Sequence, residues 1–137
     1  RQELPGVRVY AALDPYRTGM SAELRQVERK LVAGASGVFT QPFFDVDHLR
    51  SWRRVLPDEV EVWWGATTVT TLAALGYWRR RNLVAFPRDF RMELQAQREF
   101  AQRTIDLATE WGDNAYLMPV RTAPAEYLAG LRVPAAA

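Results

Sequence analysis

The chain has 137 residues, of which 48% are hydrophobic and 25% are charged, values typical of one globular domain with a sizeable core. Its net charge of only +2 gives little support to nucleic-acid binding. The absence of cysteine excludes disulfides, thiolate metal sites and a cysteine nucleophile, and with a single histidine, His48, no His-based metal site is expected.

The chain also contains no sign of membrane insertion or export. No apolar run approaches the ~18 residues that a transmembrane helix needs, so no membrane partner is expected. The first residues, RQELPGVRVY, include neither an initiator Met nor the apolar region of a signal peptide. We therefore expect a cytoplasmic protein, and we interpret residues 1–137 as one domain belonging to a longer chain.

The first half of the chain predicts two strand–helix pairs. Residues 6–13 are rich in Val and Tyr and predict a strand, which is followed by a helix from about Ser21 to a stop at Gly34. Residues 36–41 predict the second strand, which ends there because Pro42 cannot donate to a sheet ladder. Asp45 is expected to cap the second helix, which stops at Pro57. The expected buried faces of the two helices are Leu24, Val27, Leu31 and Val32, and Leu49, Trp52, Val55 and Leu56.

The second half repeats the alternation. Residues 60–66 predict a third strand, in which Trp63 and Trp64 are expected to pack in the core on both faces. Two helices follow, over roughly 70–81 and about 90–111, the second ending at Gly112. Residues 114–120 predict the fourth strand, and Thr122 with Pro124 opens a last helix.

Strands that alternate with helices of this length predict an α/β fold with a parallel sheet. A complete (β/α)8 barrel needs about 250 residues, so four such units would form half of a TIM barrel. The alternative is a small open sheet with helices on both faces. Both folds place functional groups at the C-terminal ends of the strands, here residues 13–14, 40–41, 65–68 and 119–121.

One stretch of the sequence resembles a known enzyme family. The segment ERKLVAGASGVFTQPFFDVD is similar to a segment of the methylenetetrahydrofolate reductases, in which a strand ends on Thr-Gln, aromatic residues and Asp. The resemblance runs in register from about Val7 to Leu131 and includes YLMPVR, where the family also has an arginine just after the last strand. It implies the second half of a TIM barrel that carries FAD. Such enzymes pass a hydride from NAD(P)H through FAD to 5,10-methylenetetrahydrofolate and yield 5-methyltetrahydrofolate.

The resemblance assigns substrate contacts to two residues. Gln41 falls on the family's glutamine beside the flavin and the pterin, and an amide can both donate and accept, as a pterin edge requires. Arg121 falls on the family's substrate-binding arginine, which suits a carboxylate or carbonyl of folate.

The same comparison assigns four residues of the first predicted helix to FAD. Arg29 and Lys30 fall on cations near the diphosphate, and Glu23 and Gln26 fall on polar positions near the adenosine. Glu23, Gln26 and Lys30 share one helix face, which fits a common ligand surface. A solvated helix end is the alternative interpretation for Arg29 and Lys30.

The sequence also departs from the family. Leu13 stands where the family has a flavin-stacking tyrosine, which puts the affinity for FAD in question, and Tyr16 is a possible substitute by proximity. The family's catalytic carboxylic acid belongs to earlier strands, so no catalytic residue is expected in this segment. The resemblance therefore predicts that this chain acts only together with a missing N-terminal half-barrel or through self-association.

Other interpretations remain open. Gln41 would be only a strand cap if the resemblance were accidental, and the chain would then be a non-catalytic binding or assembly module, or another folate- or flavin-using barrel enzyme. Asp45 and Asp47 are better explained as a helix cap and its neighbour than as an acid–base pair. Arg79, Arg80 and Arg81 suggest phosphate or RNA binding, although a surface helix end is the simpler explanation. Phe86 and Phe90 lie near the family's substrate-stacking aromatic residue.

Overall fold

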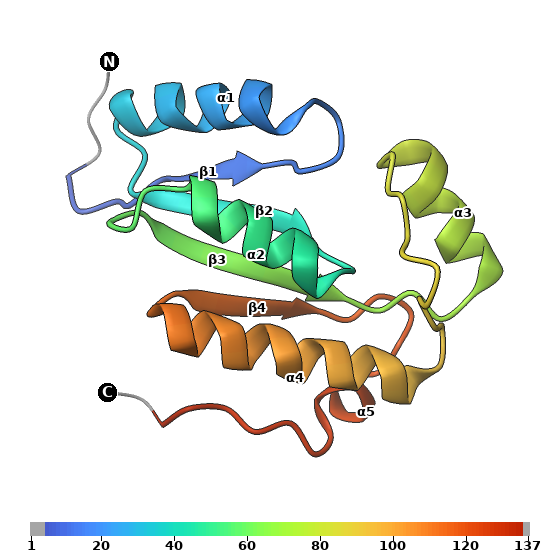
Figure 1. The fold of residues 1–137 in the computed structure, drawn as a ribbon. Helices are drawn as coiled ribbons and strands as arrows, with labels where there is room; N and C mark the ends of the chain where they lie inside the picture. Colours follow the sequence, from blue (N-terminus) through green and yellow to red (C-terminus); the bar gives the residue numbers. More distant parts are fainter. Residues whose placement is uncertain (1–4, 136–137) are drawn as a thin grey trace.

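The computed structural model describes residues 5–135, which form a four-stranded sheet and five helices (Figure 1). Among these residues no helix is both long and apolar enough to cross a membrane. In chain order the elements are β1 (Tyr10–Leu13), α1 (Met20–Val32), β2 (Gly37–Pro42), α2 (Val46–Val55), β3 (Glu61–Thr67), α3 (Leu72–Arg81), α4 (Leu94–Trp111), β4 (Asn114–Met118) and α5 (Pro124–Leu128).

All strand pairs in the sheet are parallel, and the strands lie in chain order, β1-β2-β3-β4. Each new strand therefore pairs with the strand before it, and the sheet grows in one direction from β1 to β4. In register, Val38 of β2 lies between Ala11 of β1 and Val62 of β3. The prediction of a parallel α/β sheet is confirmed, and all C-terminal strand ends meet at one edge.

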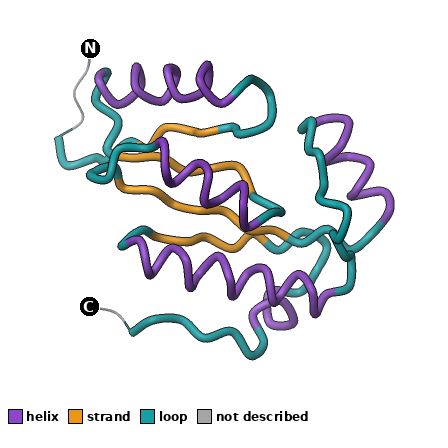
Figure 2. The backbone as a smooth tube through the Cα atoms, in the orientation of Figure 1, coloured by secondary structure: helices purple, strands orange, loops and turns teal. Residues whose placement is uncertain are grey.

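Helices α1, α2 and α4 cover one face of the sheet (Figures 1 and 2). The core between them is continuous, because apolar side chains of β1, β2 and β3 alternate inward and meet one stripe from each helix. Its fully buried large side chains include Trp64 of β3, Trp52 of α2 and Leu107 of α4. A doubly wound sheet would have helices on both faces, so this arrangement differs from that alternative.

The opposite face of the sheet carries aromatic rings that pack on one another. Phe39 lies at the centre, with ring centroids 5.2 Å from Tyr10, 5.0 Å from Trp63 and 5.5 Å from Tyr116. The carboxylate of Glu61 accepts hydrogen bonds from the Tyr10 hydroxyl and from the indole N–H of Trp63, each at 3.0 Å. All four rings are half-buried. We call this surface, defined by Tyr10, Phe39, Trp63 and Tyr116, the bare face.

Helix α3 lies apart from the other helices, beyond the C-terminal ends of the strands (Figure 1). A second apolar cluster attaches it to the sheet: Trp78 of α3 packs with Phe44, Val69 and Val84. Phe44 lies just beyond Phe43, the first residue after β2, so the chain after the second strand packs against the segment after the third. This position makes α3 a wall at the edge where functional groups are expected.

Several predicted boundaries and buried positions were wrong. The first strand begins at Tyr10 instead of residue 6, because Tyr10 pairs with the first residue of β2 and earlier residues have no strand opposite them. The long helix begins at Leu94 instead of residue 90, because Phe90 packs against Phe86 in a turn. The fourth strand ends at Met118, and Ala123 rather than Thr122 occupies the N-cap of α5.

Three residues expected in the core have other environments. Val32 is 90% exposed because it is the last residue of α1 and lies past the sheet. Val55 is 38% exposed, since Leu49, Trp52 and Leu56 already form the buried stripe of α2. Trp64 is fully buried, but Trp63 lies on the bare face, because successive strand residues point to opposite faces. The predicted caps Asp45 and Gly112 are confirmed.

Candidate functional site

A pocket of about 660 Å³ lies between α3 and the ends of β2 and β4. It brings together Gln41 and Arg121, which are 80 residues apart in the sequence and were both predicted as substrate contacts. We call it the strand-end pocket. Its lining residues are Gln41, Ala73, Ala74, Tyr77, Trp78, Asn82, Met118, Val120 and Arg121.

Three polar side chains in this pocket are free to bind a ligand. Within residues 5–135, the side chains of Gln41, Asn82 and Arg121 make no hydrogen bond or salt bridge to another residue. Around them the lining is mainly apolar, and Tyr77 and Met118 remain 55% and 38% exposed. An apolar hollow with a few convergent polar groups is the usual character of a small-molecule site.

The backbone at Arg121 is strained and firmly held. Its φ is 52°, in the left-handed region that non-glycine residues seldom occupy. The preceding residue, Val120, is fixed by the buried Thr68, whose hydroxyl donates to the Val120 carbonyl and accepts from its N–H, both at 2.8 Å. Such strain persists only where surrounding contacts enforce it, and it often occurs at binding sites. The guanidinium is thus presented at the pocket from a fixed backbone.

The strand that carries Gln41 is irregular at this point. The register between β2 and β3 shifts between Phe39 and Pro42, and side chains replace the regular ladder there. The N–H of Gly65 donates to the Thr40 hydroxyl at 3.0 Å, and the Tyr116 hydroxyl donates to the Thr40 carbonyl. Burial raises the pKa of Tyr116 to about 12, so its hydroxyl keeps its proton and remains a donor near neutral pH. The residue before Gln41 is thereby held from two strands.

The sequence reasoning missed Asn82 and Tyr77. Both belong to the α3 region: Tyr77 lies within the helix, and Asn82 is its C-terminal cap. An asparagine after a run of helical residues indicates only a helix end. Their place in the pocket depends on where α3 packs, which no local pattern reveals.

The four residues assigned to FAD do not line this pocket. Glu23 is 8% exposed and accepts a 2.9 Å hydrogen bond from the N–H of Asp14, and the amine of Lys30 donates to the Ala12 carbonyl at 2.8 Å. The Val9 carbonyl accepts a hydrogen bond from the N–H of Ser36, on the side of β2. Main-chain polar groups point to alternate sides along a strand, so those of Ala12 and Asp14 point to the outer edge of β1. Glu23 and Lys30 therefore bind main-chain groups at the free edge of the sheet, the N–H of Asp14 and the carbonyl of Ala12.

The other two assigned residues, Gln26 and Arg29, are exposed on α1. Arg29 lines a separate shallow hollow with Arg25, Glu28 and Val32. Its guanidinium has no salt bridge among the described residues. Arg29 can thus bind an anionic group, and so can Lys30 through the N–H donors that do not bond Ala12.

Of the two residues considered for flavin stacking, Leu13 is inaccessible and Tyr16 is half-buried among other aromatic side chains. Leu13 is fully buried in the core under the helices. Tyr16 lies among Phe43, Phe44 and His48, and its hydroxyl donates to the Pro42 carbonyl at 2.5 Å. Burial also raises the pKa of Tyr16. The described residues therefore do not fit a complete FAD site, because Leu13 is buried and the Tyr16 ring already packs against other aromatic rings.

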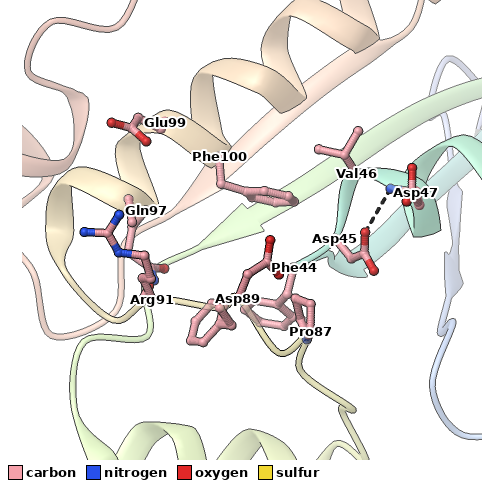
Figure 3. Close-up of a pocket in the computed structure, with 12 residues that line it drawn as sticks. Phe44, Asp45, Val46, Asp47, Pro87, Asp89, Arg91, Gln97, Glu99 and Phe100 are labelled. Carbon is pink, nitrogen blue, oxygen red and sulfur yellow. Dashed lines mark hydrogen bonds between the residues drawn. The ribbon is translucent and has the colours of Figure 1, made fainter.

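A further hollow of about 390 Å³ lies between the start of α2 and the start of α4 (Figure 3). Four carboxylates line it: Asp45, Asp47, Asp89 and Glu99. The Asp45 side chain accepts from the N–H of Asp47 at 2.9 Å, which is the helix cap expected from the sequence. Nowhere in residues 5–135 do three acidic or histidine side chains converge as metal ligands. Helix capping therefore accounts for the Asp45 carboxylate in this hollow.

No family model matches the chain, and no curated protein matches it either. The resemblance to the folate reductases accordingly remains a hypothesis drawn from the sequence. The geometry of the strand-end pocket is the observation on which a function can be proposed.

Proposed function

We propose that this chain is the substrate-binding half of a (β/α)8-barrel oxidoreductase related to methylenetetrahydrofolate reductase. The observation that carries the proposal is the meeting of Gln41 and Arg121 in one pocket at the C-terminal strand ends. Ligands of parallel α/β barrels bind at that end of the sheet. The proposed reaction reduces 5,10-methylenetetrahydrofolate to 5-methyltetrahydrofolate with NAD(P)H, in the cytoplasm.

The chemistry of the pocket suits a folate. The amide of Gln41 offers one acceptor and two donors to the edge of a pterin, and the guanidinium of Arg121 suits the glutamate carboxylates or a carbonyl. Tyr77, Met118 and Val120 provide apolar surface for the flat rings. The volume of about 660 Å³ lies within the range of small-molecule pockets.

The half-barrel itself is supported by the one-sided packing of α1, α2 and α4 and by the sequential strand order. In a closed barrel the bare face would point inward and its rings would pack against the missing half. Because Leu13 is buried in the core and Tyr16 is half-buried against other aromatic rings, FAD would be held chiefly by residues outside this chain. Arg29 and Lys30 remain proposed contacts for its diphosphate.

The second candidate is a binding or assembly module that has lost flavin chemistry. It is favoured by the burial of Leu13 at the flavin-stacking position and by the engagement of Glu23 with the main chain of β1. Flavin absorbance, measured on this chain together with the missing half-barrel, separates the two candidates, because a module without flavin chemistry retains no bound FAD.

Binding of 5-methyltetrahydrofolate by isothermal titration calorimetry tests the proposed site. We expect Arg121→Asn to raise the Kd by about 10- to 100-fold, since a hydrogen bond to a charged group contributes roughly 1.5–3 kcal/mol. Asparagine tolerates the positive φ at this position, so the variant removes the guanidinium without adding backbone strain. Gln41→Glu should also weaken binding, because a carboxylate offers acceptors only.

Arg25→Asn is the matched control, since Arg25 is exposed, lies outside the pocket and has no proposed ligand contact. An unchanged Kd in Arg121→Asn and Gln41→Glu, with the parent binding folate, would assign the ligand to another place. Failure of the parent to bind any folate would overturn the proposed substrate.

A further inference from the structure

A hollow of about 720 Å³ lies on the other side of α3 from the strand-end pocket. It is formed by α3 and the segment that leads into α4, and it shares no residue with the strand-end pocket. We call it the arginine hollow. Its lining residues are Thr70, Leu75, Arg79, Phe86, Pro87, Arg88, Phe90, Arg91, Met92 and Glu93.

The charges in the arginine hollow are unbalanced. Three guanidinium groups, those of Arg79, Arg88 and Arg91, line it together with one carboxylate, that of Glu93. Arg91 and Glu93 form an exposed ion pair at 3.5 Å, and no salt bridge involving Arg79 or Arg88 occurs within residues 5–135. Like charges that share one hollow repel each other, and a bound anion would relieve that repulsion.

Packed aromatic rings form the floor of the hollow and contact one of these arginines. The Phe86 ring lies 4.5 Å from Phe90 and 4.7 Å from Phe44, measured between ring centroids. The guanidinium carbon of Arg79 lies over the Phe86 ring at 5.8 Å, a cation–π contact that fixes the side chain and leaves its N–H donors unused. The Phe90 N–H donates to the Pro87 carbonyl at 3.1 Å, and this turn contains Arg88, which also lines the hollow.

Of the three consecutive arginines 79–81, one contributes to the arginine hollow. Arg80 lies alongside Gly76, and the carbonyl of Arg81 accepts a hydrogen bond from Arg17 at 3.0 Å. Only Arg79 lines the hollow. Arg79, Arg88 and Arg91 thus share one concave surface, and the net charge of the chain is only +2. That distribution fits a compact anion better than an extended nucleic acid.

We propose that the arginine hollow binds a small polyanion carrying at least two phosphate or carboxylate groups, held by Arg79 and Arg88 with Arg91 at the rim. Guanidinium groups bind both kinds of oxyanion through paired hydrogen bonds. The site lies outside the proposed folate pocket and does not depend on it.

The test compares binding of pyrophosphate and of citrate by isothermal titration calorimetry at constant ionic strength. We expect at least one of them to bind the parent, and the variant Arg79→Gln/Arg88→Gln to weaken that binding by about tenfold or more. Whichever of the two binds more tightly identifies phosphate or carboxylate as the ligand chemistry. Glu93→Gln should strengthen binding, because it removes the only carboxylate in the hollow.

The matched control is Arg50→Gln/Arg54→Gln, which removes the same charge from another arginine-lined hollow at the end of α2. If both double variants lost the same amount of anion affinity, the loss would be due to net charge alone, and the proposal would be overturned. Absence of binding to the parent would overturn it as well. Preference for a single-stranded oligonucleotide over both small anions would replace it with nucleic-acid recognition.

Discussion

Gly65 shows how one residue shapes the strand-end region. A Cβ atom at this position would lie 2.5 Å from the ring of Tyr116, which crosses over the glycine and bonds the Thr40 carbonyl. Any larger residue would push Tyr116 away and release the irregular part of β2 that precedes Gln41. The contact with Tyr116 supplies the physical reason for a glycine at this position.

His48, the single histidine, allows a clean test of pH-dependent stability. Burial between Tyr16 and Phe43 lowers its pKa below the ordinary 6.5, although Asp45 opposes the shift. The unfolded chain therefore binds the proton more readily than the folded one. The stability due to neutral His48 is fully present above about pH 6.5 and is lost as the pH falls through the lower pKa of the folded state.

We accordingly expect the free energy of unfolding to decrease between pH 7.5 and 5.5, and this decrease to be smaller in His48→Gln. Urea titrations across this range measure it, and the common pKa values of Asp and Glu lie lower. Identical pH profiles for parent and variant would show that His48 is equally protonated in both states.

At the scale of elements, α1 closes the outer edge of the sheet. Glu23 and Lys30, seven residues apart on one helix face, bond the N–H of Asp14 and the carbonyl of Ala12. An exposed strand edge invites pairing with other chains, and covering it with side chains is one way to prevent this. In a closed barrel a neighbouring strand would compete for the same main-chain groups.

Glu23→Ala should therefore destabilise the fold by about 1–3 kcal/mol in the absence of any ligand, because it leaves a partly buried N–H unpaired. Glu28→Ala, on the exposed side of the same helix, should change stability by less than about 0.5 kcal/mol. Urea denaturation gives both values, and amide exchange should accelerate at Asp14 in the first variant alone. If Glu23→Ala were as stable as the parent, the structural role of Glu23 would be wrong and its proposed role in ligand binding would be favoured.

At the scale of the whole molecule, the two faces of the sheet differ in kind. One is covered by α1, α2 and α4, and the other presents the rings of Tyr10, Phe39, Trp63 and Tyr116. Contiguous apolar surface of this type usually marks an interface. In the proposed barrel the interface is with the missing half, and in its absence a second copy can cover the face.

We expect this chain to self-associate at micromolar concentrations and to dissociate in Phe39→Asp, which places a charge at the centre of the bare face. Sedimentation velocity over a dilution series measures the effect. Val32→Asp, on the exposed end of α1, is the control with the same change of charge. A parent that stays monomeric at every concentration would contradict the proposed role of this face.

The sequence by itself determined the features that depend on neighbours along the chain. Alternating apolar runs and helical stripes predicted the parallel α/β sheet, and the helix signals at Asp45 and Gly112 placed two helix ends correctly, because capping and periodicity act within a few residues. The family resemblance also selected Gln41 and Arg121, which the structure brings to one pocket.

Only the tertiary structure decided what depends on contacts between distant segments. The position of α3 brought Asn82 and Tyr77 to the strand-end pocket and Arg79 to the arginine hollow, since Trp78 packs against Phe44 from another part of the chain. Likewise, Glu23 and Lys30 bond an edge strand because of where α1 crosses the sheet. Local periodicity fixes which face of a helix is apolar, but packing geometry fixes what that helix lies against.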